Sequence, residues 1–253
     1  MKFNVSSKTL YTFASSVSKI ISSRNAMQIL NNFLFELDGD VLTVTASDME
    51  NSLVGRISVT QAEGSGSFCL DARRIVELLK ELPDQGVTFE INDHNLEVVI
   101  NYTNGHYNTV AISGLEYPEH RRASDNETVT FDCACERMIK GIENTLFAVS
   151  TEEIRPQMMG ILWDVKPDEI VFVATDTRKL VKYVDMAITP GQECSFILPV
   201  KGAQVIKNVF AKEEDVRITV TPVSAIFESA TFTFDCRLIK GNFPDYNRVI
   251  PVN

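Results

Sequence analysis

Apolar residues recur along this chain with two different periods. Some segments have the period of about 3.6 residues that is typical of a helix, and others the period of 2 that is typical of a strand. Residues 7–22 repeat apolar side chains every three or four positions, which predicts a helix with one buried face. Residues 32–48 and 51–61 alternate one by one, as half-buried strands do, and Asp38-Gly39-Asp40 provides a hairpin turn. Asp71 is a suitable N-cap for a second helix that ends before Pro83. Further strands are predicted at residues 86–93, 95–103 and 106–114.

The same pattern occurs a second time, 128 residues later. Asp48 and Asp176 both end a strand, and Leu70 and Leu198 both precede a helix. The second copy has predicted helices at 135–149 and 200–210, a hairpin over 160–176 and a strand over 179–188. A period of this length indicates two domains of one fold rather than a solenoid. We expect an α+β fold with antiparallel sheets, domains at 1–122 and 123–253, and a polar linker at 119–128.

The chain has a net charge of −10, which by itself argues against a nucleic-acid partner. The basic residues are nevertheless unevenly placed, because residues 1–35 contain lysine and arginine but no aspartate or glutamate. A basic helix on an acidic body is compatible with DNA contact on one face, and equally with a solvated helix that lacks acids. Neither a signal peptide nor a membrane span is evident, and we expect a soluble, cytoplasmic protein.

A catalytic centre is not apparent in the sequence. His94, His106 and His120 are predicted in turns or loops without metal-ligand spacing, and no phosphate-binding glycine motif occurs. Asp48 and Asp176 resemble paired carboxylates, but their periodic placement favours a turn-capping role. The five cysteines form no CxxC pair, so we expect free, buried thiols. The chain is therefore predicted not to be an enzyme and to need no metal or cofactor. A small-molecule hydrolase that uses an Asp or Cys site, with Asp48 and Asp176 as the residues to test, remains an alternative.

Several segments together resemble a known family. The opening "MKF", "ILNNFLFEL", "TASDME", "DARRIVELLKELP", "ATDTRKL" and especially "GNFPDYNRVIP" are similar to the bacterial DNA polymerase III beta subunit, the sliding clamp. Members of that family have three domains, each a pseudo-twofold pair of β-α-β-β-β units, and two chains close head to tail around duplex DNA. The chain ends at Asn253, which matches the end of the second domain, so the resemblance implies a clamp that lacks its third domain.

The resemblance implies that the helices face DNA. Arg24 matches a basic DNA-facing position of the family, and other basic residues are candidates because they lie on predicted helices. These other candidates are Lys8, Lys19, Arg73, Lys80, Arg137, Lys140, Lys201 and Lys207. Since a ring holds DNA topologically, it needs only loose phosphate contacts, which is consistent with the acidic net charge.

The resemblance also implies half of a pocket for short peptides of the polymerase, the clamp loader and repair proteins. Its residues here are Met158, Thr175, Thr177, Arg178, Leu180, Pro244, Arg248 and Val249. Thr177 and Arg178 replace the commoner Gly-His pair, which affects the expected peptide preference. Leu180, Pro244 and Val249 are alternatively ordinary core and turn residues.

By the same resemblance, Arg73, Arg74 and Tyr107 belong to the edge that joins two chains into a homodimer ring. Without a third domain, the chain by itself is expected to be a monomer. The alternative from another class is a scaffold that binds partner peptides without encircling DNA.

Overall fold

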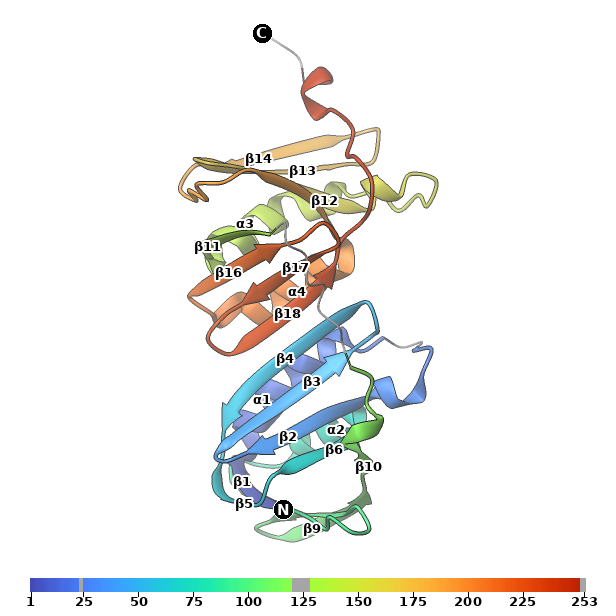
Figure 1. Ribbon diagram of the computed structural model, residues 1–253, viewed down its shortest axis with the longest axis vertical. Helices are drawn as coiled ribbons and strands as arrows, with labels where there is room; N and C mark the ends of the chain where they lie inside the picture. Colours follow the sequence, from blue (N-terminus) through green and yellow to red (C-terminus); the bar gives the residue numbers. More distant parts are fainter. Residues whose placement is uncertain (23–24, 120–127, 251–253) are drawn as a thin grey trace. The chain divides into compact units, whose positions relative to one another are not determined.

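The computed structural model describes residues 1–22, 25–119 and 128–250, and the chain divides into two compact units, Met1–Arg121 and Arg122–Asn253. Within the first unit the elements are β1 (Lys2–Ser6), α1 (Ser7–Val17), β2 (Asn32–Asp38), β3 (Val41–Ser47), β4 (Asn51–Ser58), β5 (Thr60–Glu63), β6 (Gly66–Asp71), α2 (Ala72–Glu81), β7 (Gly86–Ile91), β8 (Glu97–Tyr102), β9 (Gly105–Val110) and β10 (Ile112–Ser113) (Figure 1). Short 3₁₀ turns at Ser18–Ile20, Gln28–Asn31 and Gly114–Glu116 connect them.

The second unit repeats this order. Its elements are β11 (Val129–Ala134), α3 (Cys135–Thr145), β12 (Gly160–Lys166), β13 (Glu169–Thr175), β14 (Leu180–Asp185), β15 (Cys194–Pro199), α4 (Val200–Val209), β16 (Asp215–Val220), β17 (Ser224–Glu228) and β18 (Phe232–Arg237). The 3₁₀ turns lie at Leu146–Ala148, Pro156–Met158, Phe210–Lys212 and Tyr246–Arg248.

Each unit is a pair of β-α-β-β-β halves that exchange a strand. In the first unit β1 pairs with β7 in the order β5-β1-β7-β8-β9, while β6 pairs with β2 in the order β10-β6-β2-β3-β4. In the second unit the orders are β14-β13-β12-β15 and β18-β17-β16-β11, again antiparallel. The predicted α+β class and the pseudo-twofold halves are confirmed.

Helices and sheets form where the sequence patterns predicted them, with shorter bounds. The Asp71 carboxylate accepts a hydrogen bond from the Arg74 N–H at 2.8 Å, as an N-cap should. The first predicted helix is shorter than expected, because the α-helix ends at Val17 and one 3₁₀ turn continues to Ile20. The predicted linker falls almost entirely on residues 120–127, outside the described residues.

Aromatic side chains fill the core of each unit. In the first unit, Phe3 and Phe89 face each other across β1 and β7 and stack with ring centroids 4.9 Å apart. In the second unit the buried Trp163 contacts three phenylalanine rings, of which Phe172 is 4.6 Å away between ring centroids. Burial of such rings stabilises the packing of the two helices of each unit against the sheets. Their outer faces remain available for other contacts.

Candidate DNA-facing helices and peptide site

The outer face of the helix pair in the first unit carries several exposed cations. Lys8 on α1, Lys19 just after it and Lys80 on α2 are exposed, and none has an ion-pair partner among the described residues. Arg73 on α2 is also exposed, but its guanidinium pairs with Glu77 at 2.8 Å. Helix α1 contains no acidic residue at all. This surface is therefore open to an anionic partner.

In the second unit, two of the candidate cations are bound by the protein itself. The Arg137 guanidinium lies 3.0 Å from the carboxylate of Asp185, whose side chain is only 2% exposed, so this arginine ties α3 to β14. Lys207 on α4 pairs with Glu143 on α3 at 2.9 Å. Lys140 is exposed, and Lys201 is half-buried. Arg24, the remaining candidate, lies outside the described residues.

The two repeated aspartates close equivalent turns. Asp48 Oδ1 accepts hydrogen bonds from the N–H groups of Glu50 and Asn51 at 3.0 and 2.7 Å. Asp176 Oδ1 accepts from Arg178 and Lys179 at 3.0 and 2.9 Å. Bonds from Lys179 and Arg178 lower the pKa of Asp176 to about 2, so it is ionised at neutral pH. The predicted turn-capping role is confirmed.

The residue after each aspartate adopts a left-handed backbone. Met49 and Thr177 both have φ of 77°, a conformation that suits glycine and strains a branched side chain. Glycine at position 177 would adopt this conformation without strain. Thr177 and Arg178 are both exposed, so both side chains are available at the rim of the predicted pocket.

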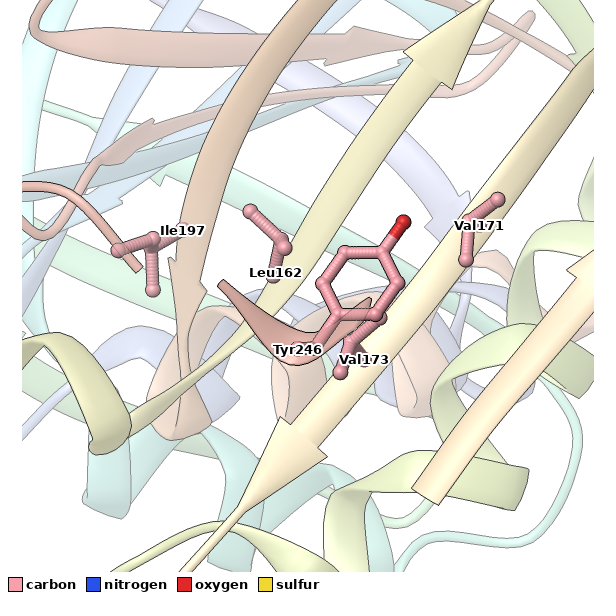
Figure 2. Close-up of a cluster of buried hydrophobic side chains, with 5 residues drawn as sticks. All are labelled: Leu162, Val171, Val173, Ile197 and Tyr246. Carbon is pink, nitrogen blue, oxygen red and sulfur yellow. The ribbon is translucent and has the colours of Figure 1, made fainter. Parts of the chain in front are cut away.

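The C-terminal segment of the second unit lies on the outer face of the sheet that contains β12 and β13. The ring of Tyr246 packs over Leu162, Val171 and Val173, with Ile197 alongside (Figure 2). Its hydroxyl donates a 2.8 Å hydrogen bond to Asp164, and the Lys182 ammonium lies 5.3 Å from the ring centroid. Burial, with the bond to Asp164, raises the pKa of Tyr246 to about 12. Tyr246 therefore anchors this segment to the sheet.

The predicted pocket residues around this anchor differ in their exposure to solvent. Leu180 is half-buried against the Tyr246 cluster, whereas Val249 is 66% exposed. Pro244 lines a cavity of about 460 Å³ between the C-terminal segment and the sheet, which none of the other predicted pocket residues lines. Arg248 is exposed and pairs with Asp245 at 2.9 Å.

Two predicted contact residues are mostly covered in this structure. Met158 is 8% exposed at the end of a 3₁₀ turn, and Thr175 is 7% exposed. The Thr175 hydroxyl donates to the Lys179 carbonyl at 2.8 Å and accepts from the Thr177 N–H at 3.2 Å. Thr175 therefore supports the turn beneath Thr177.

The sequence interpretation missed Tyr246, Asp164 and Lys182, which position the C-terminal segment. A signal was present in the sequence, because Tyr117 stands near the end of the first copy as Tyr246 does near the end of the second, and the structure buries both. Of the residues predicted at the dimer edge, Arg73 and Arg74 are exposed on α2, and Tyr107 is half-buried on β9, the last strand of its sheet.

Cysteines and histidines provide no catalytic arrangement in the described part of the chain. All five cysteines are free, and burial raises the pKa of Cys69 to about 12 and of Cys135 to about 11, which makes them poor nucleophiles. Cys194 is only half-buried, contrary to expectation, because it begins an edge strand. His106 lies on β9 rather than in a turn, and His120 is outside the described residues.

Among the same residues, no cluster of three or more His, Cys, Asp or Glu could hold a metal ion. None of the described helices has the length and apolar character needed to span a membrane.

Comparison with known proteins covers both units in order. The model for the DNA polymerase III beta subunit N-terminal domain matches residues 1–121, and the model for its central domain matches residues 133–245. The beta sliding clamp of Bacillus subtilis is 26% identical over 260 residues, and that of Synechococcus elongatus is 28% identical over 259 residues. Each alignment covers 99% of this chain and 68% of the relative.

Solved structures show the same fold. The sliding clamp of Bacillus subtilis superposes with a TM-score of 0.88 at 26% identity, covering all of this chain and 68% of that one. A Pseudomonas aeruginosa sliding clamp bound to griselimycin superposes with a TM-score of 0.92 at 24% identity and the same coverage. With consecutive domain models matching nearly its whole length, the chain belongs to the family of bacterial DNA polymerase III beta subunits, the sliding clamps.

Proposed function

We propose that this chain acts as a sliding clamp, holding the replicative polymerase on duplex DNA and recruiting partner proteins to it. The observation that carries the proposal is the ordered match of both units to consecutive domains of one non-catalytic processivity factor. The chain spans about two thirds of its relatives, so a closed ring would include a further domain-sized segment in each subunit. We place this activity in the cytoplasm, where bacterial replication takes place.

The charge distribution supports a loose hold on DNA. A protein with a net charge of −10 cannot depend on strong phosphate neutralisation over its whole surface. The exposed lysines of α1 and α2 are instead concentrated on one face of their unit, where they would contact phosphates weakly and release them easily. Weak contacts of this kind are compatible with sliding, because the ring itself prevents dissociation.

The same DNA assignment includes Arg24 and Lys201. Neutralising both, as Arg24→Gln with Lys201→Gln, is expected to weaken binding of a labelled duplex more than Arg56→Gln, which removes an exposed cation from β4. Equal losses from the two changes would contradict the assignment of DNA contact to the helix-bearing face.

The peptide site is proposed at Leu180, Pro244 and Val249, with Thr177, Arg178 and Arg248 on its rim. Support comes from the exposed or half-buried state of these six side chains beside the Tyr246 cluster, where apolar anchors of a short peptide could be buried. Met158 and Thr175 would form its floor. The exposed Arg178 should favour peptides that carry an acidic residue next to their apolar anchors.

A fluorescent clamp-binding peptide tests this site by anisotropy. Leu180→Ala should weaken binding several-fold, since it removes an anchor-contacting side chain. Leu115→Ala is the matched control, because Leu115 is 92% exposed and lies in the first unit. Failure of the peptide to saturate the unaltered chain, or equal affinity of the two variants, would refute the site.

Assembly into a head-to-tail ring is proposed through β9 and α2, with Arg73, Arg74 and Tyr107 at the contact. The alternative, a peptide-binding scaffold that does not encircle DNA, predicts different behaviour of the complete ring. A clamp should be retained on covalently closed circles and lost from linear DNA, whereas a scaffold should not distinguish them.

A further inference from the structure

The edge strand of a sheet in the second unit borders a cavity of about 460 Å³. Strand β15 is the last in the order β14-β13-β12-β15, and its neighbour β12 pairs Leu162 with Ile197 (Figure 2). Two residues along the same strands, Asp164 pairs with Ser195. These four residues line the cavity from the sheet, and residues 240–246 of the C-terminal segment line it from the other side.

The first unit covers the corresponding edge with its own chain. There β10 pairs with β6, and Ser67 of β6 is half-buried. A Cβ atom on Gly114 would come within 2.2 Å of the Ser67 hydroxyl oxygen, so the segment after β10 lies directly against the strand. The first unit therefore fills the space at its own edge strand.

In the second unit the equivalent segment leaves the strand. The Ile239 N–H donates to the Ile197 carbonyl at 3.1 Å, which matches the pairing of Ile112 in the first unit. Gly241 follows Ile239 by two positions, as Gly114 follows Ile112. Its φ of 112° is a conformation that suits glycine, and a Cβ atom there would meet nothing within 4 Å. The chain thus turns away from the edge at Gly241.

The segment returns to the sheet at Tyr246, whose hydroxyl donates to Asp164 at 2.8 Å. Between these two attachments, residues 240–244 make no hydrogen bond to any described part of the sheet. Ser195 is the counterpart of Ser67 at the offset of 128, and it is exposed where Ser67 is half-buried. The longer connection of the second unit therefore leaves the edge at Ser195 uncovered.

The backbone of Ser195 points into this space. Both polar groups of a residue in an antiparallel strand face the same side, and the side alternates along the strand. Because the Ile197 carbonyl faces the C-terminal segment, the N–H and C=O of Ser195, two residues earlier, face the same way. Among the described residues, none of that segment bonds to them. An unpaired N–H and C=O on a sheet edge are the groups to which an added strand binds.

The charges around the cavity favour a basic partner residue. Asp164 Oδ2 accepts the bond from Tyr246, which fixes the carboxylate, while Oδ1 has no partner in the described chain. Lys240 also lines the cavity, but it is exposed, and its long side chain can extend into water. Asp245 is already paired with Arg248 at 2.9 Å. The fixed charge that remains available is thus a carboxylate.

We propose that the β15 edge at Ser195 binds an extended peptide segment of a partner protein, which adds a strand to the sheet beneath residues 240–244. An apolar side chain of that segment packs on Leu162 and Phe243, and a lysine or arginine two positions away reaches Asp164, because alternate side chains share a face. This site is separate from the peptide site proposed at Leu180, whose side chain does not line the cavity.

A phage-displayed library of random heptapeptides tests the edge. Selection on the 253-residue chain, with an excess of clamp-binding peptide to block the other site, should recover sequences with an apolar and a basic residue two positions apart. A synthetic, end-capped peptide of this kind should bind Ser195→Ala within about twofold of the unaltered chain, since the backbone is intact. Ser195→Pro removes the N–H that faces the cavity and should weaken binding about tenfold.

Two further measurements separate backbone pairing from charge. N-methylation of the peptide backbone should cause the same loss as Ser195→Pro without altering the protein, and Trp163 fluorescence confirms that the protein variants are folded. Asp164→Asn keeps an acceptor for Tyr246 but removes the charge. Acetylating the peptide lysine should therefore weaken binding several-fold to the unaltered chain and have no effect on binding to Asp164→Asn.

Three results would overturn the proposal. One is a selection that yields no peptide sensitive to Ser195→Pro or to backbone methylation. Another is loss of binding in Leu180→Ala, which would assign the selected peptides to the other site and leave the clamp function standing. The third is a dimer of the chain in analytical ultracentrifugation that Ser195→Pro abolishes, because the edge would then be occupied by a second copy rather than by a partner peptide.

Discussion

The two units share one topology, but the large side chain that fills the space between helix and sheet lies on a different element in each. Position 13 on α1 is Phe13, and its counterpart on α3 is Gly141; position 44 on β3 is Val44, and its counterpart on β13 is Phe172. A Cβ atom on Gly141 would come within 2.5 Å of the Phe172 ring. The large side chain of the pair thus lies on the helix in the first unit and on the strand in the second, where the absence of a side chain at Gly141 leaves room for the Phe172 ring.

The C-terminal segments of the units differ in length. In the first unit Ile112 pairs with Cys69, and Tyr117 follows five positions later. In the second unit the Ile239 N–H donates to the Ile197 carbonyl at 3.1 Å, and Tyr246 follows seven positions later. The longer segment reaches farther across the sheet, which places Tyr246 beside Asp164 and forms the wall of the cavity at Pro244.

The largest expected effect comes from filling the space at Gly141. Gly141→Ala should lower the free energy of unfolding of the second unit by about 3 kcal/mol, because the added methyl group overlaps the Phe172 ring. In a Phe172→Val background the same change should cost much less. Urea unfolding followed by the fluorescence of Trp163, the single tryptophan, measures this unit. An equal cost in both backgrounds would show that the two positions are not coupled.

Alkaline pH should weaken the second unit through Tyr246. Its pKa is raised to about 12 in the folded state, above the ordinary value of about 10, so its contribution is complete below pH 10 and is lost as pH rises toward 12. We expect the unaltered protein to lose about 2 kcal/mol more than Tyr246→Phe between pH 9 and 12.

Tyr117→Phe is the control for that measurement, since Tyr117 belongs to the first unit and Trp163 to the second. It should leave the pH dependence of the transition monitored by Trp163 unchanged. The same pH profile for the unaltered protein and Tyr246→Phe would contradict the role of the hydroxyl.

Removing the Arg137–Asp185 ion pair of the second unit should have a somewhat smaller effect on stability. Arg137→Met leaves the buried Asp185 carboxylate without its charged partner, which should cost about 1–2 kcal/mol given that the arginine is half exposed. The first unit has Thr9 and Ile57 at the corresponding positions and no such pair. Thr9→Met is therefore the matched control, and thermal unfolding that is lowered equally by both would refute a specific role for the pair.

The sequence predicted features that depend on nearby residues. Asp71 at the start of α2 and the aspartates 48 and 176 accept hydrogen bonds from backbone groups a few positions away, and Gly39 gives the first hairpin turn its φ of 56°. Arg137 was instead assigned to the DNA surface, because a helical period shows only that it is exposed. Its partner Asp185 is 48 residues distant on a strand, and only the folded structure brings them together.

For the candidate site, too, the residues could be predicted but not their contacts in the folded chain. The resemblance identified Leu180, Pro244 and Val249, but it could not show that the Thr175 hydroxyl donates a hydrogen bond to the Lys179 carbonyl within its turn. The pairing of Gly141 with Phe172 was equally hidden, since complementary volumes leave no local pattern in either segment.

The smallest effect is expected at the left-handed turns. Thr177→Gly should raise the free energy of unfolding by up to about 1 kcal/mol, because glycine adopts φ of 77° without steric strain. Met49→Gly in the first unit should gain less, since methionine is unbranched at Cβ. Guanidinium unfolding of both variants tests the comparison, and destabilisation by Thr177→Gly would show that the threonine side chain makes a compensating contact.

We propose that the two equivalent folds carry different partners: DNA on the helix-bearing face of the first unit, and a peptide beside Tyr246 in the second. Backbone amide NMR of the 253-residue chain, titrated separately with duplex DNA and with a clamp-binding peptide, tests it most directly. DNA should shift signals around Lys19, Arg73 and Lys80, and the peptide should shift those around Thr177, Leu180 and Val249. Perturbation of one common surface by both ligands would contradict this assignment.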